Sequence, residues 1–286
     1  MTLWPYRWDH LLRYRYIEII SLWEGRLTTG HLTRTFGIGR QQASKDINHY
    51  ARDIAPGNLI YDKYLKGYKP TAEFEPRVTQ GTADEYLHLM TRDEQLMGVF
   101  ESLPLTTANV EQIRPPMRQV APEILRPMIQ AARQGRRLEV DYVSLQHPDR
   151  EGRIIVPHTL VFTGYRWHVR AWCEKNRDFR DFVLSRFRGE ADLLDESDRS
   201  EDQDERWQQR VTLSITPDPR LSEDQREVVA TDYGMTDHRL TLETRGTLVT
   251  YLLQRLQLDS DDVHENPLAQ QIVLENRDEL SPWLFG

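Results

Sequence analysis

The first 70 residues carry apolar positions at helical spacing, followed by a short alternating pattern. Leu12, Tyr16, Ile19 and Trp23 form the first helical stripe, and Gly25 follows closely enough to end that helix. The same spacing rules predict a second helix capped at 28–29, a Gly37–Ile38–Gly39 turn, a third helix over 40–53, and strands over 59–62 and 67–69. The predicted order is helix, helix, turn, helix and hairpin.

The central part of the chain changes character twice. Prolines interrupt residues 71–136, which predicts a helical connector with short helices such as 83–90 and 123–133. Beyond the connector, apolar positions recur with period two, over 138–142 and 167–172. Three further apolar stretches, at 154–156, 160–162 and 182–187, complete a predicted sheet of four or five strands.

The end of the chain is predicted to form a module of its own. Residues 192–205 are polar and acidic, with almost no apolar side chain after Leu194, which predicts a linker. Strand and helix patterns then alternate, at 211–216, 223–230, 240–243, 248–258 and 271–274. This order is typical of a small α+β module of ferredoxin-like type. The chain is therefore expected to be an α+β multidomain protein, with domains at 1–70, 71–136, 137–195 and 196–286.

Length and composition agree with several domains. The chain has 286 residues, of which 38% are hydrophobic, more than one modest core needs. Its single cysteine excludes a disulfide framework and any multi-cysteine metal site. No apolar run approaches the roughly 20 residues of a membrane helix. The first residues also lack the apolar core of a signal peptide, so we expect a soluble, cytoplasmic protein with no membrane partner.

Charge is distributed unevenly along the chain. The formal net charge of -8 argues against a nucleic-acid partner only if it is uniform. Residues 1–70 hold 11 Lys and Arg against 6 Asp and Glu, whereas the remaining residues hold 26 against 39. A basic first segment on an acidic body is what an attached nucleic-acid-binding module would show.

The third predicted helix carries the clearest functional pattern. Ala43, Ile47, Tyr50 and Ile54 fall on one narrow apolar stripe. The remaining face is polar and basic and suits base edges and phosphates in a major groove. The predicted DNA-binding residues on this helix are Arg40, Gln41, Gln42, Ser44, Lys45, Asn48 and Arg52, with Lys63 and Lys66 on the hairpin as a wing. The solvated face of an ordinary helical bundle is the alternative.

The predicted sheet offers a second cluster. His168 and Arg170 alternate onto one face of the 167–172 strand, and neighbouring segments carry further polar side chains. The candidate ligand-binding residues are Tyr142, Ser144, His158, His168, Arg170 and Arg186. Arginine forks and hydroxyls suit an anionic ligand, although such residues on a sheet face are more often solvated or locally paired.

The sequence gives little support for the hypothesis that the protein is an enzyme. The histidines lack a partner at HxH or HExxH spacing, and Cys173 has no evident activating neighbour. No phosphate-binding glycine motif occurs. Acid pairs such as Asp202 and Asp204, or Asp261 and Asp262, fall in polar segments and are expected to be solvated. We therefore expect no catalytic residues, no metal and no cofactor.

Three stretches of the sheet region resemble the WYL domain. They are 156–160, Val-Pro-His-Thr-Leu; 164–172, Gly-Tyr-Arg-Trp-His-Val-Arg-Ala-Trp; and 182–187, Phe-Val-Leu-Ser-Arg-Phe. The triplet that names the family reads Trp167-His168-Val169 here, a variant similar to that of the BrxR and CapW type of WYL repressors associated with phage-defence islands. Residues 36–44 are also similar to the winged helix-turn-helix of those repressors, and the resemblance spans nearly the whole chain.

The resemblance implies a fold and a function. It implies a winged helix-turn-helix, a helical connector, an Sm-like β-barrel WYL domain and a C-terminal WCX-like dimerisation module. It also implies that the WYL pocket senses a nucleotide or nucleic-acid ligand that alters DNA binding.

The main hypothesis is a homodimeric transcriptional repressor of a phage-defence or neighbouring operon that binds an inverted-repeat DNA operator. A nucleotide or single-stranded nucleic acid would release or modulate it. The alternative is a nucleic-acid-sensing or scaffold module without operator specificity.

Overall fold

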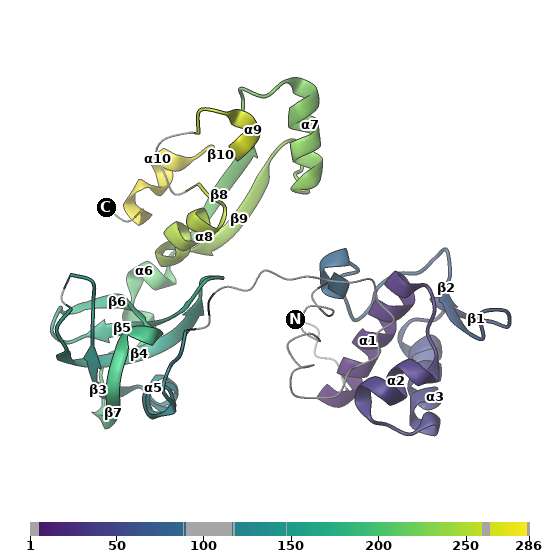
Figure 1. Ribbon diagram of the computed structural model, residues 1–286, viewed down its shortest axis with the longest axis horizontal. Helices are drawn as coiled ribbons and strands as arrows, with labels where there is room; N and C mark the ends of the chain where they lie inside the picture. The colour runs from purple at the N-terminus through teal and green to yellow at the C-terminus, as the bar shows by residue number, and fades with distance from the viewer. Residues whose placement is uncertain are drawn as a thin grey trace. The chain divides into compact units, whose positions relative to one another are not determined.

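The protein divides into two compact units, Met1–Arg114 and Pro115–Gly286. The computed structural model describes residues 6–87, 89, 116, 118–146, 148–258 and 264–284 (Figure 1). Much of the predicted connector, including its prolines at 104 and 115, lies outside the described residues. Of the helix predicted over 83–90, residues 83–87 and 89 are helical.

The first unit contains the predicted helices and hairpin. They are α1 (Trp8–Glu24), α2 (Thr29–Phe36), α3 (Arg40–His49), a π-helical turn (Tyr50–Ile54), β1 (Leu59–Asp62) and β2 (Gly67–Pro70). Gly25 ends α1 at φ 69°, a left-handed conformation that favours glycine. Thr28 precedes α2, and its N–H donates to Nδ1 of His31 at 3.0 Å, which satisfies a free helix donor. The sequence prediction of these elements is confirmed.

The core of the first unit explains why the three helices pack together. Ile17, Leu32, Ile47 and Tyr50 are fully buried, one or more from each helix or its continuation. Leu27, between α1 and α2, pairs with Tyr68 of β2 through two backbone hydrogen bonds of 2.7 and 2.8 Å. The hairpin is therefore fixed to the helices by backbone pairing.

A buried carboxylate closes this core. Glu18 of α1 is completely buried and accepts hydrogen bonds from the hydroxyl of Tyr50 at 2.9 Å and from three consecutive backbone N–H groups, those of residues 77–79, at 2.7 to 3.0 Å. The Thr79 hydroxyl adds a fifth donor at 2.8 Å. These donors compensate the buried charge, so Glu18 fixes the segment after the hairpin onto α1.

The second unit contains a five-stranded antiparallel sheet. Its strands are β3 (Arg136–Tyr142), β4 (Glu151–Phe162), β5 (Trp167–Cys173), β6 (Asp178–Val183) and β7 (Phe187–Glu196), in the order β6-β5-β4-β3-β7. Helix α5 (Pro122–Gln134) covers one face and buries Ile124, Met128 and Ala131 against it (Figure 1). The two strands predicted at 154–156 and 160–162 are one strand, β4, with an irregularity between Pro157 and Thr159.

The sheet curls without closing. β6 and β7 are its two edges, yet only the short turn Leu184–Arg186 separates them in sequence. The Tyr142 hydroxyl of β3 accepts a hydrogen bond from the backbone N–H of Val183 at 3.1 Å, which draws the β6 edge towards β3. No pairing between β6 and β7 is found among the described residues, so the expected Sm-like barrel is not confirmed.

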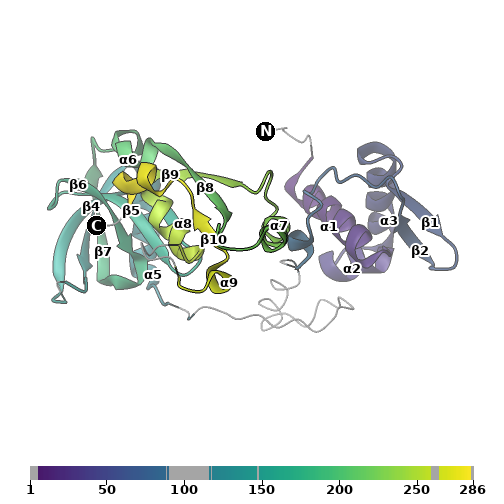
Figure 2. The same cartoon turned by 90° about the horizontal axis from the view of Figure 1, so that it is seen from above.

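The C-terminal module is α+β, as predicted, but it is not ferredoxin-like. It contains β8 (Arg210–Pro217), α7 (Glu223–Asp232), β9 (Leu240–Arg245), α8 (Val249–Arg255), α9 (Pro267–Gln270), β10 (Ile272–Leu274) and α10 (Arg277–Leu280). Helix α8 packs on the sheet through Val249 and Leu253 (Figure 2). The sheet has three antiparallel strands in the order β10-β8-β9, so a four-stranded ferredoxin-like sheet is absent from the described part of the module.

The predicted linker at 192–205 is wrong. Strand β7 continues to Glu196, a 3-10 turn follows at Glu201–Gln203, and α6 (Glu205–Gln208) begins immediately after Asp204. Three acids of this segment, Asp195, Glu201 and Asp204, are paired with arginines distant in sequence, for example Asp195 with Arg137 at 2.8 Å. Composition alone cannot reveal such pairing, and for this reason it predicts a solvated linker here.

Replacing Glu18 by Gln is expected to lower the free energy of unfolding of the first unit by roughly 2–4 kcal/mol. An amide offers one acceptor oxygen and turns an NH₂ group towards backbone donors, which leaves buried N–H groups unpaired. Chemical denaturation monitored by circular dichroism measures the change. Glu73→Gln, at an exposed position of the same unit, is the control and should change stability by less than about 0.5 kcal/mol. Equal stabilities of the two variants would contradict the role given to Glu18.

Candidate functional site

Helix α3 presents its polar residues away from the core, as predicted. Ala43, Ile47 and Tyr50 are fully buried, whereas Arg40, Gln41, Gln42, Lys45, Asn48 and Arg52 are exposed and Ser44 is half-buried. The one acid of the helix, Asp46, is buried and receives the Arg13 guanidinium at 2.7 Å. The exposed face of α3 itself (Arg40–His49) therefore carries no acid, whereas Arg52 lies in the π-helical turn that follows, next to Asp53.

The exposed residues of α3 differ in how they are held. Gln42 donates to Asp46 at 2.8 Å, and Arg52 pairs with its neighbour Asp53 at 2.8 Å. Asn48 accepts a long hydrogen bond of 3.3 Å from the Tyr68 hydroxyl of β2. The Gln41 side chain makes no hydrogen bond, and Arg40 and Lys45 form no ion pair, with any residue that the structure describes. These three side chains are the most available for an external partner.

The hairpin turn is ordered by a carboxylate. Asp62 accepts hydrogen bonds from the backbone N–H groups of Tyr64 and Leu65 at 2.8 and 3.0 Å and pairs with Lys69 at 2.8 Å. Hydrogen bonding to Lys69 and to these two amides lowers the pKa of Asp62 to about 2. Lys63 and Lys66 are exposed within the same turn, so the hairpin carries positive charge at its tip.

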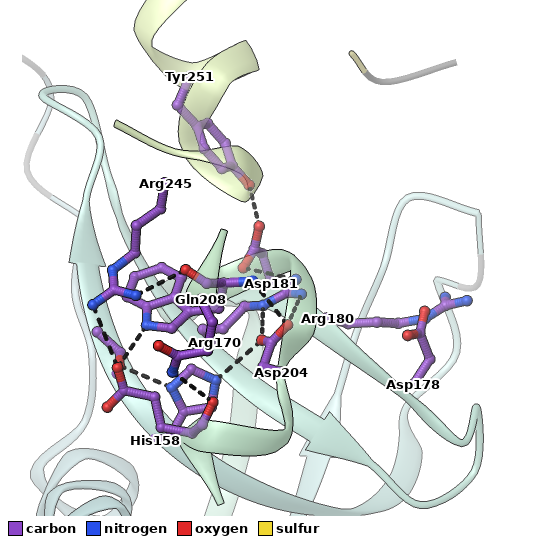
Figure 3. A network of polar contacts seen from close by, with 12 residues as sticks. His158, Arg170, Asp178, Arg180, Asp181, Asp204, Gln208, Arg245 and Tyr251 are labelled. Atoms are coloured by element: carbon purple, nitrogen blue, oxygen red, sulfur yellow. Dashed lines mark hydrogen bonds and ion pairs between the residues drawn. The ribbon is translucent and has the colours of Figure 1, made fainter. Parts of the chain in front are cut away.

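In the second unit, a buried ion pair occupies one predicted ligand site (Figure 3). The Arg170 guanidinium of β5 donates two hydrogen bonds to Asp204, at 2.7 and 3.1 Å, and lies 3.4 Å from Asp181 of β6. His158 Nε2 of β4 lies 3.3 Å from the same Asp204 carboxylate, which also accepts a hydrogen bond from the backbone N–H of Trp207. Arg170 and His158 come together as predicted, but an internal carboxylate satisfies them.

Burial and hydrogen bonding act in opposite directions on the pKa values of the two acids in this network. Burial alone would raise the pKa of Asp204, but hydrogen bonds with His158 and Arg170 outweigh it and lower that pKa to about 2. Burial raises the pKa of Asp181, and Arg170 offsets this only in part. The Tyr251 hydroxyl of α8 donates to Asp181 at 3.2 Å. The network thus joins the sheet to both α6 and α8 of the C-terminal module.

The other predicted ligand residues lie in different surroundings. Tyr142 belongs to the core under α5, together with Val169 and Ala171, so it lies on the opposite face of the sheet from Arg170. Ser144 follows β3 in a loop, and Arg186 ends the turn between β6 and β7.

His168 lies on the Arg170 side of β5. It is buried, and its ring packs against Tyr251 at a centroid distance of 4.9 Å.

Sequence reasoning missed three members of the network, Asp181, Asp204 and Tyr251. Asp204 was assigned to a solvated acid pair, yet it is almost completely buried. The apolar Trp207 three residues later was the one local sign that this acid starts a packed helix, where it accepts the Trp207 N–H. Among the described residues no group of three His, Cys, Asp or Glu side chains could hold a metal ion, and no helix is long and apolar enough to cross a membrane.

Asp204→Asn is expected to lower the free energy of unfolding of the second unit by roughly 3–5 kcal/mol, because it leaves a buried guanidinium without its main counter-charge. Denaturation in urea followed by tryptophan fluorescence measures this change, since Trp207 contacts the site. Asp202→Asn, at an exposed position two residues away, is the matched control and should behave like the wild type. Coincident unfolding curves for both variants would show that the ion pair does not stabilise the unit.

The buried His168 is expected to make the second unit sensitive to acid. Burial, followed by the positive charges of Arg166, Arg186 and Arg118, lowers its pKa to about 4. Between pH 6.5 and 4 the unfolded chain therefore binds the proton more tightly, and stability decreases as pH decreases.

We expect His168 to contribute a loss of about 2 kcal/mol in the free energy of unfolding between pH 7 and pH 5. His168→Gln should remove this part of the pH dependence, whereas His238→Gln, at an exposed histidine, should retain it. An unchanged slope for His168→Gln would disprove the assignment.

Comparison with known proteins extends these observations. The BrxR transcriptional regulator winged helix-turn-helix domain matches residues 9–92, the WYL domain matches 123–190, and the BrxR transcriptional regulator C-terminal dimerization domain matches 210–280.

Two solved structures have only a low similarity to this chain. They are proteasome accessory factor B/C (PafBC) of Arthrobacter aurescens, at 13% identity and TM-score 0.30, and a CRISPR Cas-related protein, at 12% and 0.28. The matches cover 96% and 56% of this chain, but only 45% and 48% of those chains.

Three relatives that match this chain over nearly its full length have a higher sequence identity than these two structures. The DNA-binding transcriptional repressor CapW of Stenotrophomonas maltophilia is 32% identical, over 97% of this chain and 93% of its own length. CapW of Pseudomonas aeruginosa is 34% identical and that of Escherichia coli (strain KTE188) 32% identical, each over 96% of this chain and 91% of theirs. Domain order and full-length similarity agree with the resemblance seen in the sequence. The chain therefore belongs to the BrxR and CapW family of WYL-domain transcriptional regulators.

Proposed function

We propose that this protein is a homodimeric DNA-binding repressor that recognises an inverted-repeat operator. The observation that carries the proposal is the exposed face of α3, where Arg40, Gln41 and Lys45 are available and the only acid is buried against Arg13. Arginine and glutamine read base edges in the major groove, and lysine contacts phosphates. Lys63 and Lys66 on the hairpin would add contacts to the DNA backbone.

Two further observations support a dimer that acts as a repressor. The segment at 210–280 matches a dimerization domain, and the full-length relatives are named as DNA-binding repressors. A two-fold dimer reads both halves of a palindrome, which one winged helix cannot do. The domains proposed for these roles are 1–70 for DNA, 71–136 as connector, 137–195 for the ligand, and 196–286 for dimerisation.

The second part of the proposal is regulation by a ligand of the WYL domain. A nucleotide or a single-stranded nucleic acid would bind this domain and release or modulate the repressor, whose target is a phage-defence or neighbouring operon. Such control requires that the ligand bind the DNA-bound and the free conformations with different affinities.

The double variant Arg40→Ala, Lys45→Ala is expected to weaken operator binding about 100-fold or more, because each lost contact is worth about 1–3 kcal/mol. The measurement is a mobility-shift titration with DNA from upstream of the gene. Arg77→Ala, an exposed arginine of the same unit paired with Glu75, is the control and should bind as the wild type does.

The hairpin is tested by the salt dependence of binding. Because a dimer carries four such lysines, Lys63→Ala, Lys66→Ala should reduce the slope of log K against log salt by up to about 4, since each phosphate contact contributes about 0.9. Unchanged binding by the α3 variant would remove the proposed recognition face. Equal affinity of the wild type for unrelated duplexes, with steep salt dependence, would favour a nucleic-acid-sensing or scaffold module instead.

A further inference from the structure

The turn between β4 and β5 gathers arginines without acidic partners. Arg118, Arg166, Arg186 and Arg255 form no ion pair with any residue that the structure describes. Other arginines of the acid-rich second unit, such as Arg137, Arg170 and Arg220, pair with carboxylates at 2.6 to 2.7 Å. Unpaired positive charge in an acidic domain is the arrangement expected of an anion site.

These arginines are close to one another. Arg166 and Arg255 line one cavity of about 420 Å³ between the β4–β5 turn and α8, together with Thr163, Gly164, Tyr165, Tyr251 and Gln254. The Arg255 side chain crosses Gly164 so closely that a Cβ there would lie 3.4 Å from it. The Arg118 guanidinium lies over the Tyr165 ring at 4.7 Å. Arg118, Arg166 and Arg186 all act electrostatically on His168.

His168 supplies an independent sign of a missing partner. The side chain is only 2% exposed, and its Nδ1 is buried without a hydrogen-bond partner among the described residues. An unpaired buried polar atom is costly and usually indicates an absent water or ligand. The His168 ring packs against Tyr251, which itself lines the cavity.

Aromatic rings surround the same turn. Phe162, Tyr165 and Trp167 are each about half exposed, at 52%, 54% and 50%. The rings of Phe162 and Trp167 lie 5.0 Å apart at 35°. Exposed rings next to arginines are the combination that holds unpaired bases by stacking and their phosphates by charge.

We propose that the cavity between the β4–β5 turn and α8 binds the phosphate of a nucleotide unit, with Arg166 and Arg255 on the phosphate and the exposed ring of Tyr165 on the base. The proposal rests on the proposed ligand regulation and places the ligand beside the Arg170–Asp204 pair instead of upon it. The cavity has the volume of a small-molecule site, and its walls come from both the sheet and the C-terminal module.

The test is direct binding of a fluorescein-labelled hexamer of thymidine to the full-length protein, measured by anisotropy at low salt. The background chain carries Arg40→Ala and Lys45→Ala, so that the α3 face does not contribute. Adding Arg166→Ala and Arg255→Ala should raise Kd at least tenfold, and Tyr165→Leu should raise it about tenfold. Arg180→Ala is the matched control on β6, where Arg180 is exposed and pairs with Asp178, and should change Kd less than twofold.

Competition distinguishes the two sources of the phosphate. Displacement of the hexamer by adenosine monophosphate supports a mononucleotide ligand, and displacement only by unlabelled hexamer supports a single strand.

The pair Arg166→Lys, Arg255→Lys, which keeps the charge, should recover part of the affinity and shows that the alanine variant has not merely unfolded. Absence of hexamer binding, or equal Kd values for the Arg166→Ala, Arg255→Ala chain and its background, would falsify the inference. Operator binding by the wild-type chain tests the repressor function separately, so failure of either leaves the other standing.

Discussion

The second unit depends on one buried ion pair, that between Arg170 and Asp204. Both side chains are almost fully withdrawn from water, which costs several kcal/mol for each charge unless the geometry is good. Here the geometry compensates, because the guanidinium and the carboxylate form two parallel hydrogen bonds and the remaining carboxylate sites contact His158 and the Trp207 N–H. Since Asp204 begins α6, the pair fixes the start of the C-terminal module onto the sheet.

This pairing changes the meaning of the arginines around it. A sheet face with Arg170 and His158 looks like an anion site when only its own strands are considered. In the folded protein, however, the Asp204 carboxylate pairs with both side chains, so they are not available to an external anion. Arg166 and Arg255, at the neighbouring cavity, form no ion pair with any residue that the structure describes. In a body with 26 basic and 39 acidic residues beyond position 70, internal pairing decides which arginines can still attract an anion.

The part of the molecule that sequence could predict is the part fixed by local rules. The buried stripe of α3 follows from helical periodicity, and the end of α1 at Gly25 follows from the left-handed conformation that glycine tolerates. The Arg170–Asp204 pair joins positions 34 residues apart, and no local pattern encodes it. Tyr142 was grouped with Arg170 because both lie in the sheet, but the curl of the sheet and the cover of α5 place Tyr142 in the core.

Regulation of such a protein requires an element with two arrangements, each preferred by a different ligand. The contact between the sheet and α8 has the properties of such an element. It includes the hydrogen bond of 3.2 Å from Tyr251 to Asp181, and it borders the cavity at the β4–β5 turn. A ligand held by Arg166 from the sheet and Arg255 from α8 would favour one spacing of these two elements over others. Because α8 belongs to the module that matches a dimerization domain, a change in that spacing would reach the arrangement of the dimer, and the spacing of two winged helices determines which operator they can bind together.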